Sequence, residues 1–152
     1  MQVMGSPTEY LSILLQDKKY LITGVTEIDK VWEQVLPFIE APLTYNNGEF
    51  EAEDIYKALI EKKMQLWVAF NDRIRAAMVT EVVNYPRKKI VRIVTLGGEN
   101  MMGWIDDGVN LLKRWAKTQG ATGLEVIGRK GWIRTLDKLG FIHTHVVLKK
   151  EI

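Results

Sequence analysis

The chain has 152 residues, which is enough for one domain with a sizeable core and too few for two. Apolar residues make up 47% of it and charged residues 26%, a balance typical of soluble globular proteins. No apolar run approaches the roughly 18 residues of a membrane span, so we expect no membrane partner. A net charge of +2 lacks the basic excess of dedicated nucleic-acid binders, which makes nucleic acid an unlikely partner.

Cysteine is absent, which excludes disulfides, thiolate metal sites and a cysteine nucleophile. The first twenty residues lack the basic start and the small-residue cleavage site of a secretory signal. Both observations are compatible with a reducing compartment, and we expect a cytoplasmic protein.

Residues 1–19 are expected to form an extension, and residues 20–152 a single domain. Pro37 is expected to end the first helix, and Gly120 the long one. Antiparallel hairpins come first, and a helical crossover to a parallel neighbour follows, so the order predicts an α/β fold with a mixed sheet. In chain order, hydrophobic periodicity predicts strand 20–25, helices 28–36 and 55–60, strands 64–70, 73–83 and 89–96, a long helix to about residue 119, strand 124–127, helix 132–139 and strand 141–148.

One stretch joins the third strand of the meander to the long helix and reads LGGENMMGWIDDG, residues 96–108. Its four glycines permit a close backbone approach to an anion at the start of a helix, where free N–H groups and the helix dipole favour negative charge. The same glycines also suit a plain tight turn. The sequence leaves both interpretations open.

The order of elements resembles the GNAT superfamily of acyl-CoA N-acyltransferases over about residues 20–148. Three stretches carry the resemblance: YLITGVTEIDKVWEQVL, LLKRWAKTQGATGLEV and RTLDKLGF. Three others are similar to small GNAT-like proteins encoded by tailed bacteriophages: MQLWVAF, VTEVVNYPRKKIVRI and the region from LEVIGRKGWIRTLDKLGF to VVLKKE. The resemblance implies a twisted, mostly antiparallel sheet of about six or seven strands with a splayed parallel pair, flanked by about four helices.

In that superfamily acetyl-CoA lies in the gap between the two splayed strands. The resemblance implies that the backbone of Val94, Thr95 and Leu96 pairs with the pantetheine. It also implies that the pyrophosphate lies at the start of the long helix, against Gly98, Asn100 and Gly103. Arg129 is a candidate for holding the 3′-phosphate of CoA or an acidic partner.

The sequence departs from the superfamily pattern at two places. At the phosphate loop only Gly103 fits the pattern, because Asn100 and Ile105 replace the usual residues, and Asp106 and Asp107 add negative charge. On the helix before the Gly-Phe pair, Leu136 stands where a tyrosine often protonates the leaving thiolate. Protonation then has to come from Tyr85 or from water.

Glu81 is the candidate general base, because it lies on the long middle strand among apolar neighbours. Glu125 is the second candidate, flanked by Leu124 and Val126. The alternative for each is a strand carboxylate that points to solvent or pairs with Arg92 or Lys89.

The leading hypothesis is an N-acetyltransferase that transfers an acetyl group directly from acetyl-CoA to an amine of a small molecule or a protein. The alternative is an inactive phage protein on the same fold that acts in particle assembly or binds a virion or host protein, with Ile105, Trp104 or Trp132 filling the cleft. A homodimer is possible under either hypothesis. A weaker third is a nucleic-acid-binding module. His143 and His145 lack an evident third ligand, so no metal is expected.

Overall fold

The computed structural model describes residues 20–45, 48–128 and 130–152; the predicted extension 1–19 and Arg129 lie outside them. Within the described residues five strands form one sheet in the order β1-β2-β3-β4-β5. The first four strands form three antiparallel pairs, and β5 pairs with β4 in parallel. The mixed, mostly antiparallel sheet confirms the predicted fold class. The strands are β1 (Leu21–Val25), β2 (Gln65–Phe70), β3 (Ile74–Asn84), β4 (Lys89–Gly98) and β5 (Gly123–Val126).

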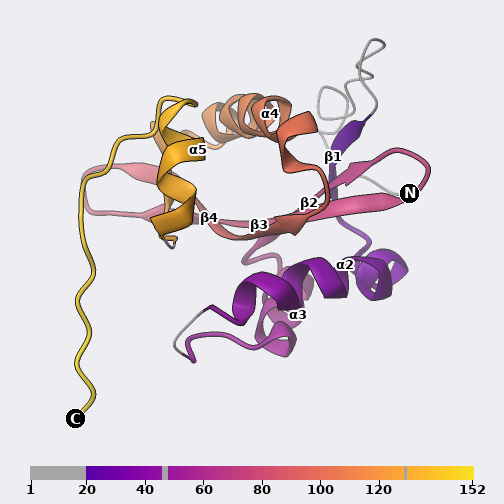
Figure 1. Ribbon diagram of the computed structural model, residues 1–152, viewed down its shortest axis with the longest axis horizontal. Helices are drawn as coiled ribbons and strands as arrows, with labels where there is room; N and C mark the ends of the chain where they lie inside the picture. Colours follow the sequence, from indigo (N-terminus) through magenta and orange to yellow (C-terminus); the bar gives the residue numbers. More distant parts are fainter. Residues whose placement is uncertain (1–19, 46–47, 129) are drawn as a thin grey trace.

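Helices cover both faces of the sheet (Figure 1). On one face lie α2 (Ile28–Leu43) and α3 (Ala52–Ile60), and on the other lies α4 (Ile105–Thr118), with the short α5 (Ile133–Asp137) beside it. Single 3₁₀ turns precede α4 and α5, at Met101–Gly103 and Lys130–Trp132. None of the helices in the described part of the chain is long and apolar enough to span a membrane.

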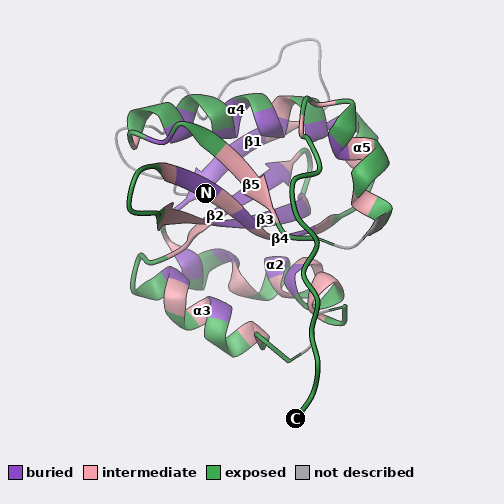
Figure 2. Cartoon of the chain, turned by 90° about the vertical axis from the view of Figure 1, so that its left-hand side faces the viewer, coloured by how far each residue is buried: buried purple, intermediate pink, exposed green. Residues whose placement is uncertain are grey.

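The two faces bury separate cores, and the buried residues lie on the strands and on the sides of the helices that face the sheet (Figure 2). Under α4, the rings of Trp67 and Trp115 meet edge to face with centroids 5.2 Å apart. The indole N–H of Trp67 donates to Oγ1 of Thr80 at 2.9 Å, which satisfies a polar atom in that core. Under α2 and α3, Val35 and Ile39 are fully buried against the other face.

The first helix does not end at Pro37, as the sequence predicted, but continues to Leu43. A proline inside a helix removes one backbone hydrogen bond and usually bends or breaks the helix. Here Ile39, two residues beyond Pro37, is fully buried, so the apolar contact with the sheet outweighs the local preference to stop.

The predicted strand over residues 141–148 is absent; residues 141–150 have no regular secondary structure. The backbone amide of Phe141 donates to the carbonyl of Leu136 at 3.1 Å and closes α5. Beyond that point the chain runs as an extended segment (Figure 1). A strand needs a paired neighbour for its backbone groups, and no described strand supplies one. High β-propensity alone therefore did not produce the sixth strand.

Candidate active site

β4 and β5 form the parallel pair of the sheet, and their pairing ends part-way along β4. They are paired from Ile90 and Gly123 to Ile93 and Val126. β5 ends there, whereas β4 runs on to Gly98 with only β3 beside it. In sheets with parallel crossovers, ligands bind in the crevice beyond the carboxyl ends of such strands. We call the place where the two strands separate the fork.

A β-bulge lies at the fork. Ile93 pairs with Thr80 and Thr95 pairs with Val79, so Val94 has no partner on β3. A bulged residue leaves its backbone groups outside the ladder and bends the strand. The predicted cofactor strand, which consists of Val94, Thr95 and Leu96, therefore begins at an irregular position with an unpaired side toward β5. The Oγ1 atom of Thr95 is buried and has no hydrogen-bond partner among the described residues.

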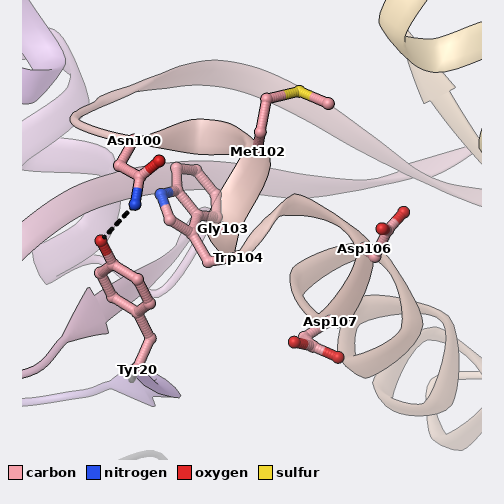
Figure 3. A pocket seen from close by; sticks show the side chains of 7 residues that line it. All are labelled: Tyr20, Asn100, Met102, Gly103, Trp104, Asp106 and Asp107. Carbon is pink, nitrogen blue, oxygen red and sulfur yellow. Dashed lines mark hydrogen bonds between the residues drawn. The ribbon is translucent and has the colours of Figure 1, made fainter. Parts of the chain in front are cut away.

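After β4, the residues around the first turn of α4 line a pocket of about 300 Å³ (Figure 3). Asn100 adopts a left-handed conformation with φ of 48°, and its amide Nδ2 donates to the hydroxyl of Tyr20 at 3.0 Å. These two residues form one side of the pocket, and two aspartates of α4 stand on the other (Figure 3). The residues that line the pocket are Tyr20, Asn100, Met102, Gly103, Trp104, Asp106 and Asp107.

Three of the four glycines of the 96–108 stretch stand where a Cβ would come too close to another part of the chain, whereas a Cβ on Gly108 would make ordinary contact with Trp104 at 3.7 Å. A Cβ on Gly97 would overlap the carbonyl oxygen of Phe38 and approach Pro42 of α2 to 2.9 Å. A Cβ on Gly98 would overlap Ala76 on β3. A Cβ on Gly103 would lie 2.9 Å from Nδ2 of Asn100. Close packing thus explains these glycines without a ligand, which answers much of the question that the sequence left open.

The pocket is not closed by the aromatic and aliphatic side chains beside it. Trp104 and Ile105 are 4% and 3% exposed in the core under α4, and Nε1 of Trp104 donates to the carbonyl of Glu99 at 2.9 Å. Trp132 is half-buried against the same core. The filled cleft expected for an inactive protein is therefore not seen at the first turn of α4.

The charge at this turn is unfavourable for an anion. Asp106 and Asp107 occupy the first turn, where their negative charges stabilise the helix by interacting with its dipole and would repel a phosphate. No side chain caps the helix, since the N-cap residue Trp104 makes no capping hydrogen bond. The amide of Gly103 is already bonded to the carbonyl of Asn100 at 2.9 Å. The hydrogen-bond donors that remain for an anion are therefore the backbone amides in the first turn of α4.

All three predicted catalytic residues meet around one cation, Arg92 of β4. Its Nε donates to Oε1 of Glu125 at 2.7 Å, and its Nη1 donates to Oε1 of Glu81 at 3.2 Å. The Tyr85 hydroxyl donates to Oε2 of Glu125 at 3.0 Å and accepts a bond from Arg92 at 3.4 Å. The expectation that Glu81 stands among apolar groups was wrong, and its pairing with Arg92, the alternative, is what the structure shows.

The cluster lies at the fork, on the face that carries α2 and α3. The neighbouring pair Val82 and Val91 packs under α4, so Glu81 and Arg92 are on the opposite face. Arg92 and Glu125 form the last strand pair but one before β4 and β5 separate. The side chains of Arg92 and both glutamates are about a quarter to a third exposed, which leaves them open to a substrate.

The charge state of Arg92 follows from its surroundings. Burial lowers the pKa of its guanidinium, but the hydrogen bond and charge of Glu125, with smaller contributions from Tyr85 and Glu81, raise it by more. The net pKa is above the ordinary value, so Arg92 stays charged. Two carboxylates face this one cation, which gives the four side chains a net charge of −1 when both glutamates are ionised.

At position 136, where the resemblance expects a tyrosine that protonates the thiolate, the structure has a buried leucine that is 7% exposed. Arg129 is outside the described residues, so its predicted contact with CoA has no structural counterpart. Among residues 20–45, 48–128 and 130–152, no group of three or more histidines and carboxylates is placed to hold a metal ion. Sequence reasoning missed the bond between Tyr20 and Asn100, which are 80 residues apart.

No protein-family model matches the sequence, and no curated protein matches it. Solved structures do match. An aminoglycoside acetyltransferase from an uncultured soil metagenomic sample has a TM-score of 0.68 and 13% identity, covering 88% of this chain and 98% of that one. The chain has the fold of the GNAT acetyltransferases. The glucosamine-6-phosphate N-acetyltransferase of Arabidopsis thaliana has a TM-score of 0.63 and 13% identity, covering 88% of this chain and 99% of that one.

A third matching structure was solved with a ligand. It is a predicted acetyltransferase from Clostridium acetobutylicum, solved with acetyl-CoA, with a TM-score of 0.63 and 13% identity over 87% of this chain and 96% of that one. The TM-scores show a shared GNAT-like fold, and at 13% identity they show the fold alone.

Proposed function

We propose that the chain is an N-acetyltransferase that transfers an acetyl group from acetyl-CoA directly to an amine. The observation that carries the proposal is the fork. There β5 ends and leaves one side of β4 unpaired, next to the Arg92 cluster on the α2 and α3 face. The chain that follows β4 forms the open pocket at the first turn of α4. The solved acetyltransferases of the same fold, one of them with acetyl-CoA, support it.

The residues beyond the fork fit an extended thioester substrate. Val94, Thr95 and Leu96 would pair through their backbone with the amides of the pantetheine, since β5 ends at Val126 and leaves this side of β4 unpaired. The first-turn amides of α4 would bind the pyrophosphate, against the opposing charge of Asp106 and Asp107. Asn100 and Tyr20 would line the same pocket.

The Arg92 cluster would supply the proton transfers. In the reaction the amine nitrogen attacks the thioester carbon, the C–N bond forms and the C–S bond breaks. Glu81 would take the proton that the amine loses, because only its Oε1 is bonded and its Oε2 remains available to a substrate. Tyr85 or a water molecule would return a proton to the thiolate. Arg92 and Glu125 would hold Tyr85 and Glu81 in position.

The net charge of −1 in the cluster favours a cationic acceptor, and a small-molecule or protein amine fits it equally. The resemblance to phage-encoded proteins, and with it an inactive protein that binds a virion or host protein, remains a prediction. An open pocket gives that alternative no support, while the leucine at position 136 withholds one proton donor that an active enzyme would use.

The test is thiol release from acetyl-CoA in the presence of a panel of primary amines and lysine peptides. Because the chain has no cysteine, every thiol detected is CoA. We expect at least one amine to raise thiol release above the hydrolysis background, with acetylated acceptor found by mass spectrometry. Acetyl-CoA binding without turnover on any amine would favour the inactive alternative.

A further inference from the structure

Three threonines are buried among the described residues, and one of them differs from the other two in its hydrogen bonds. Oγ1 of Thr80 accepts the indole N–H of Trp67 and donates to Oε1 of Gln65, both at 2.9 Å. Oγ1 of Thr23 donates to a neighbouring backbone carbonyl at 3.2 Å. Oγ1 of Thr95 has no partner among the described residues, although Thr95 is only 5% exposed. A hydroxyl that loses water without gaining a partner destabilises a fold, so this one needs an explanation.

The β-bulge at Val94 decides which face of the sheet carries Thr95. Ile93 packs in the core under α4, and with strict alternation Thr95 would lie on the same face. Thr95 instead lies opposite Val79, which is in the core under α2 and α3, and directly opposite residues share a face. The extra residue therefore turns the Thr95 hydroxyl to the face that carries the Arg92 cluster.

Thr95 also lies just beyond the fork. The last pair of β4 and β5 joins Ile93 to Val126, so Thr95 stands about 7 Å further along β4, where β5 no longer runs beside it. A ligand that lies beside β4 at the spacing of a neighbouring strand is about 5 Å from the backbone of Thr95, within reach of its hydroxyl. Before the fork, on the same face, Arg92 holds Glu81, the proposed general base.

We propose that the hydroxyl of Thr95 donates a hydrogen bond to the carbonyl oxygen of the thioester and stabilises the negative charge that develops there. The inference rests on the acetyltransferase function proposed above. As the amine nitrogen bonds to the carbonyl carbon, the electron pair of the C=O bond moves to the oxygen, where Thr95 binds it. When the pair returns, the C–S bond breaks and its electrons leave with the sulfur. Glu81 takes the proton of the amine, and Tyr85 or a water molecule protonates the thiolate.

A buried donor that makes no bond in the free protein suits this role. A hydrogen bond to a developing charge is stronger in a site shielded from water than in water, and a donor fixed in advance breaks no existing bond when the substrate binds. The cost falls on the stability of the free protein, because the hydroxyl is buried there without a partner. Stability and catalysis therefore make opposite demands at Thr95, which gives the inference a test besides activity.

The first test measures the Tm of the free protein without any ligand. Thr95→Val replaces the hydroxyl by a methyl group of similar shape, so we expect a higher Tm than that of the parent chain. Thr80→Val is the matched control, since it removes two hydrogen bonds from a comparably buried threonine, and it should lower Tm. A lower Tm for Thr95→Val would mean that the hydroxyl has a partner in the free protein. That result would overturn the role of Thr95 and leave the acetyltransferase proposal in place.

The second test compares ligands with and without the thioester carbonyl. In calorimetric titrations Thr95→Val should weaken the binding of acetyl-CoA about two- to tenfold and leave that of CoA unchanged, because CoA lacks this carbonyl. Its kcat should fall about 10²–10³-fold, the effect of removing one such donor. Thr95→Ser keeps the hydroxyl and loses the buried methyl group, so it should lower Tm but retain kcat.

The two proposals fail in different ways. An unchanged kcat for Thr95→Val in an active enzyme, or an equal loss of affinity for acetyl-CoA and CoA, would overturn the role of Thr95 alone. If the parent chain binds neither compound, the acetyltransferase proposal fails and the role of Thr95 fails with it. The expected result is a crossover, in which Thr95→Val gains stability and loses kcat, while Thr95→Ser loses stability and keeps kcat.

Discussion

The guanidinium of Arg92 on β4 is bonded to the carboxylate of Glu125 on β5, Nε to Oε1 at 2.7 Å, one residue pair before the two strands separate. This bond links the two strands one residue pair before their pairing ends. It also connects Glu81 and Tyr85 to the same cation. The cluster therefore has a structural role in the sheet besides any role in chemistry.

Removing the cation should destabilise the fold. Arg92→Met leaves the carboxylates of Glu81 and Glu125 without their shared cation, and Glu125 keeps only the Tyr85 hydroxyl. We expect a loss of about 1–2 kcal/mol in the free energy of unfolding, below that of a fully buried pair because solvent screens these side chains. Urea unfolding measures it, with the exposed Arg114→Met on α4 as the control. Adding Glu81→Gln to Arg92→Met should recover part of the loss; no recovery would argue against repulsion between the two glutamates.

The two glutamates should differ in their effect on catalysis. If Glu81 is the general base, Glu81→Gln lowers kcat by about 10²–10⁴-fold with little change in the KM for acetyl-CoA. Glu125→Gln should lower kcat less, because Glu125 acts through Arg92 and Tyr85. Steady-state rates with the acceptor found in the amine screen measure both. A larger loss for Glu125→Gln than for Glu81→Gln would reverse the two assignments.

The aspartates at the start of α4 should weaken the binding of CoA compounds. Asp106→Asn removes one negative charge from the first turn, so the Kd for acetyl-CoA should fall by about two- to fivefold, the equivalent of about 0.3–1 kcal/mol. The same change should cost the free protein a similar amount of stability. Glu53→Gln in the first turn of α3 is the matched control, with the loss of stability but no change in Kd. An unchanged Kd for Asp106→Asn would place the pyrophosphate elsewhere.

Gly97 should be required for folding rather than for binding. Gly97→Ala places a methyl group against the backbone of α2 at Phe38, and we expect a loss of about 1–3 kcal/mol of stability from overpacking. Gly131→Ala, whose Cβ would meet nothing within 4 Å, should stay within about 0.5 kcal/mol of the parent chain. Thermal and urea unfolding measure both. If Gly97→Ala is neutral in stability but abolishes acetyl-CoA binding, the glycine belongs to the cofactor site.

Much of the sheet follows from local sequence patterns. Tyr85 and Lys88 close the turn between β3 and β4 with a backbone bond of 2.8 Å, and the two strands pair symmetrically about it. Counting outward from the turn places Glu81 opposite Arg92, so the ion pair was predictable from the hairpin. The alternation of side chains along β3 alone does not predict it, because that pattern does not say which residue of β4 lies opposite Glu81.

The features that sequence patterns missed depend on contacts between distant segments. Continuation of α2 past Pro37 depends on the burial of Ile39 against the sheet. The bond between Tyr20 and Asn100 needs the fold before it exists. Whether residues 141–148 form a strand depends on an available sheet edge rather than on their β-propensity alone. The glycines of the 96–108 stretch were ambiguous because a close helix and a bound anion favour the same residue type.

Calorimetric titration with acetyl-CoA shows whether the fork and the pocket at α4 bind this compound, and ADP is the control for unspecific anion binding. We predict saturable binding of one acetyl-CoA per chain, and at a hundredfold excess over Kd a gain of about 2.7 kcal/mol in stability, seen as a rise in Tm. ADP should bind far more weakly, because it lacks the pantetheine that pairs with β4. No heat and no change in Tm at millimolar acetyl-CoA would contradict the binding of acetyl-CoA at the fork and the pocket.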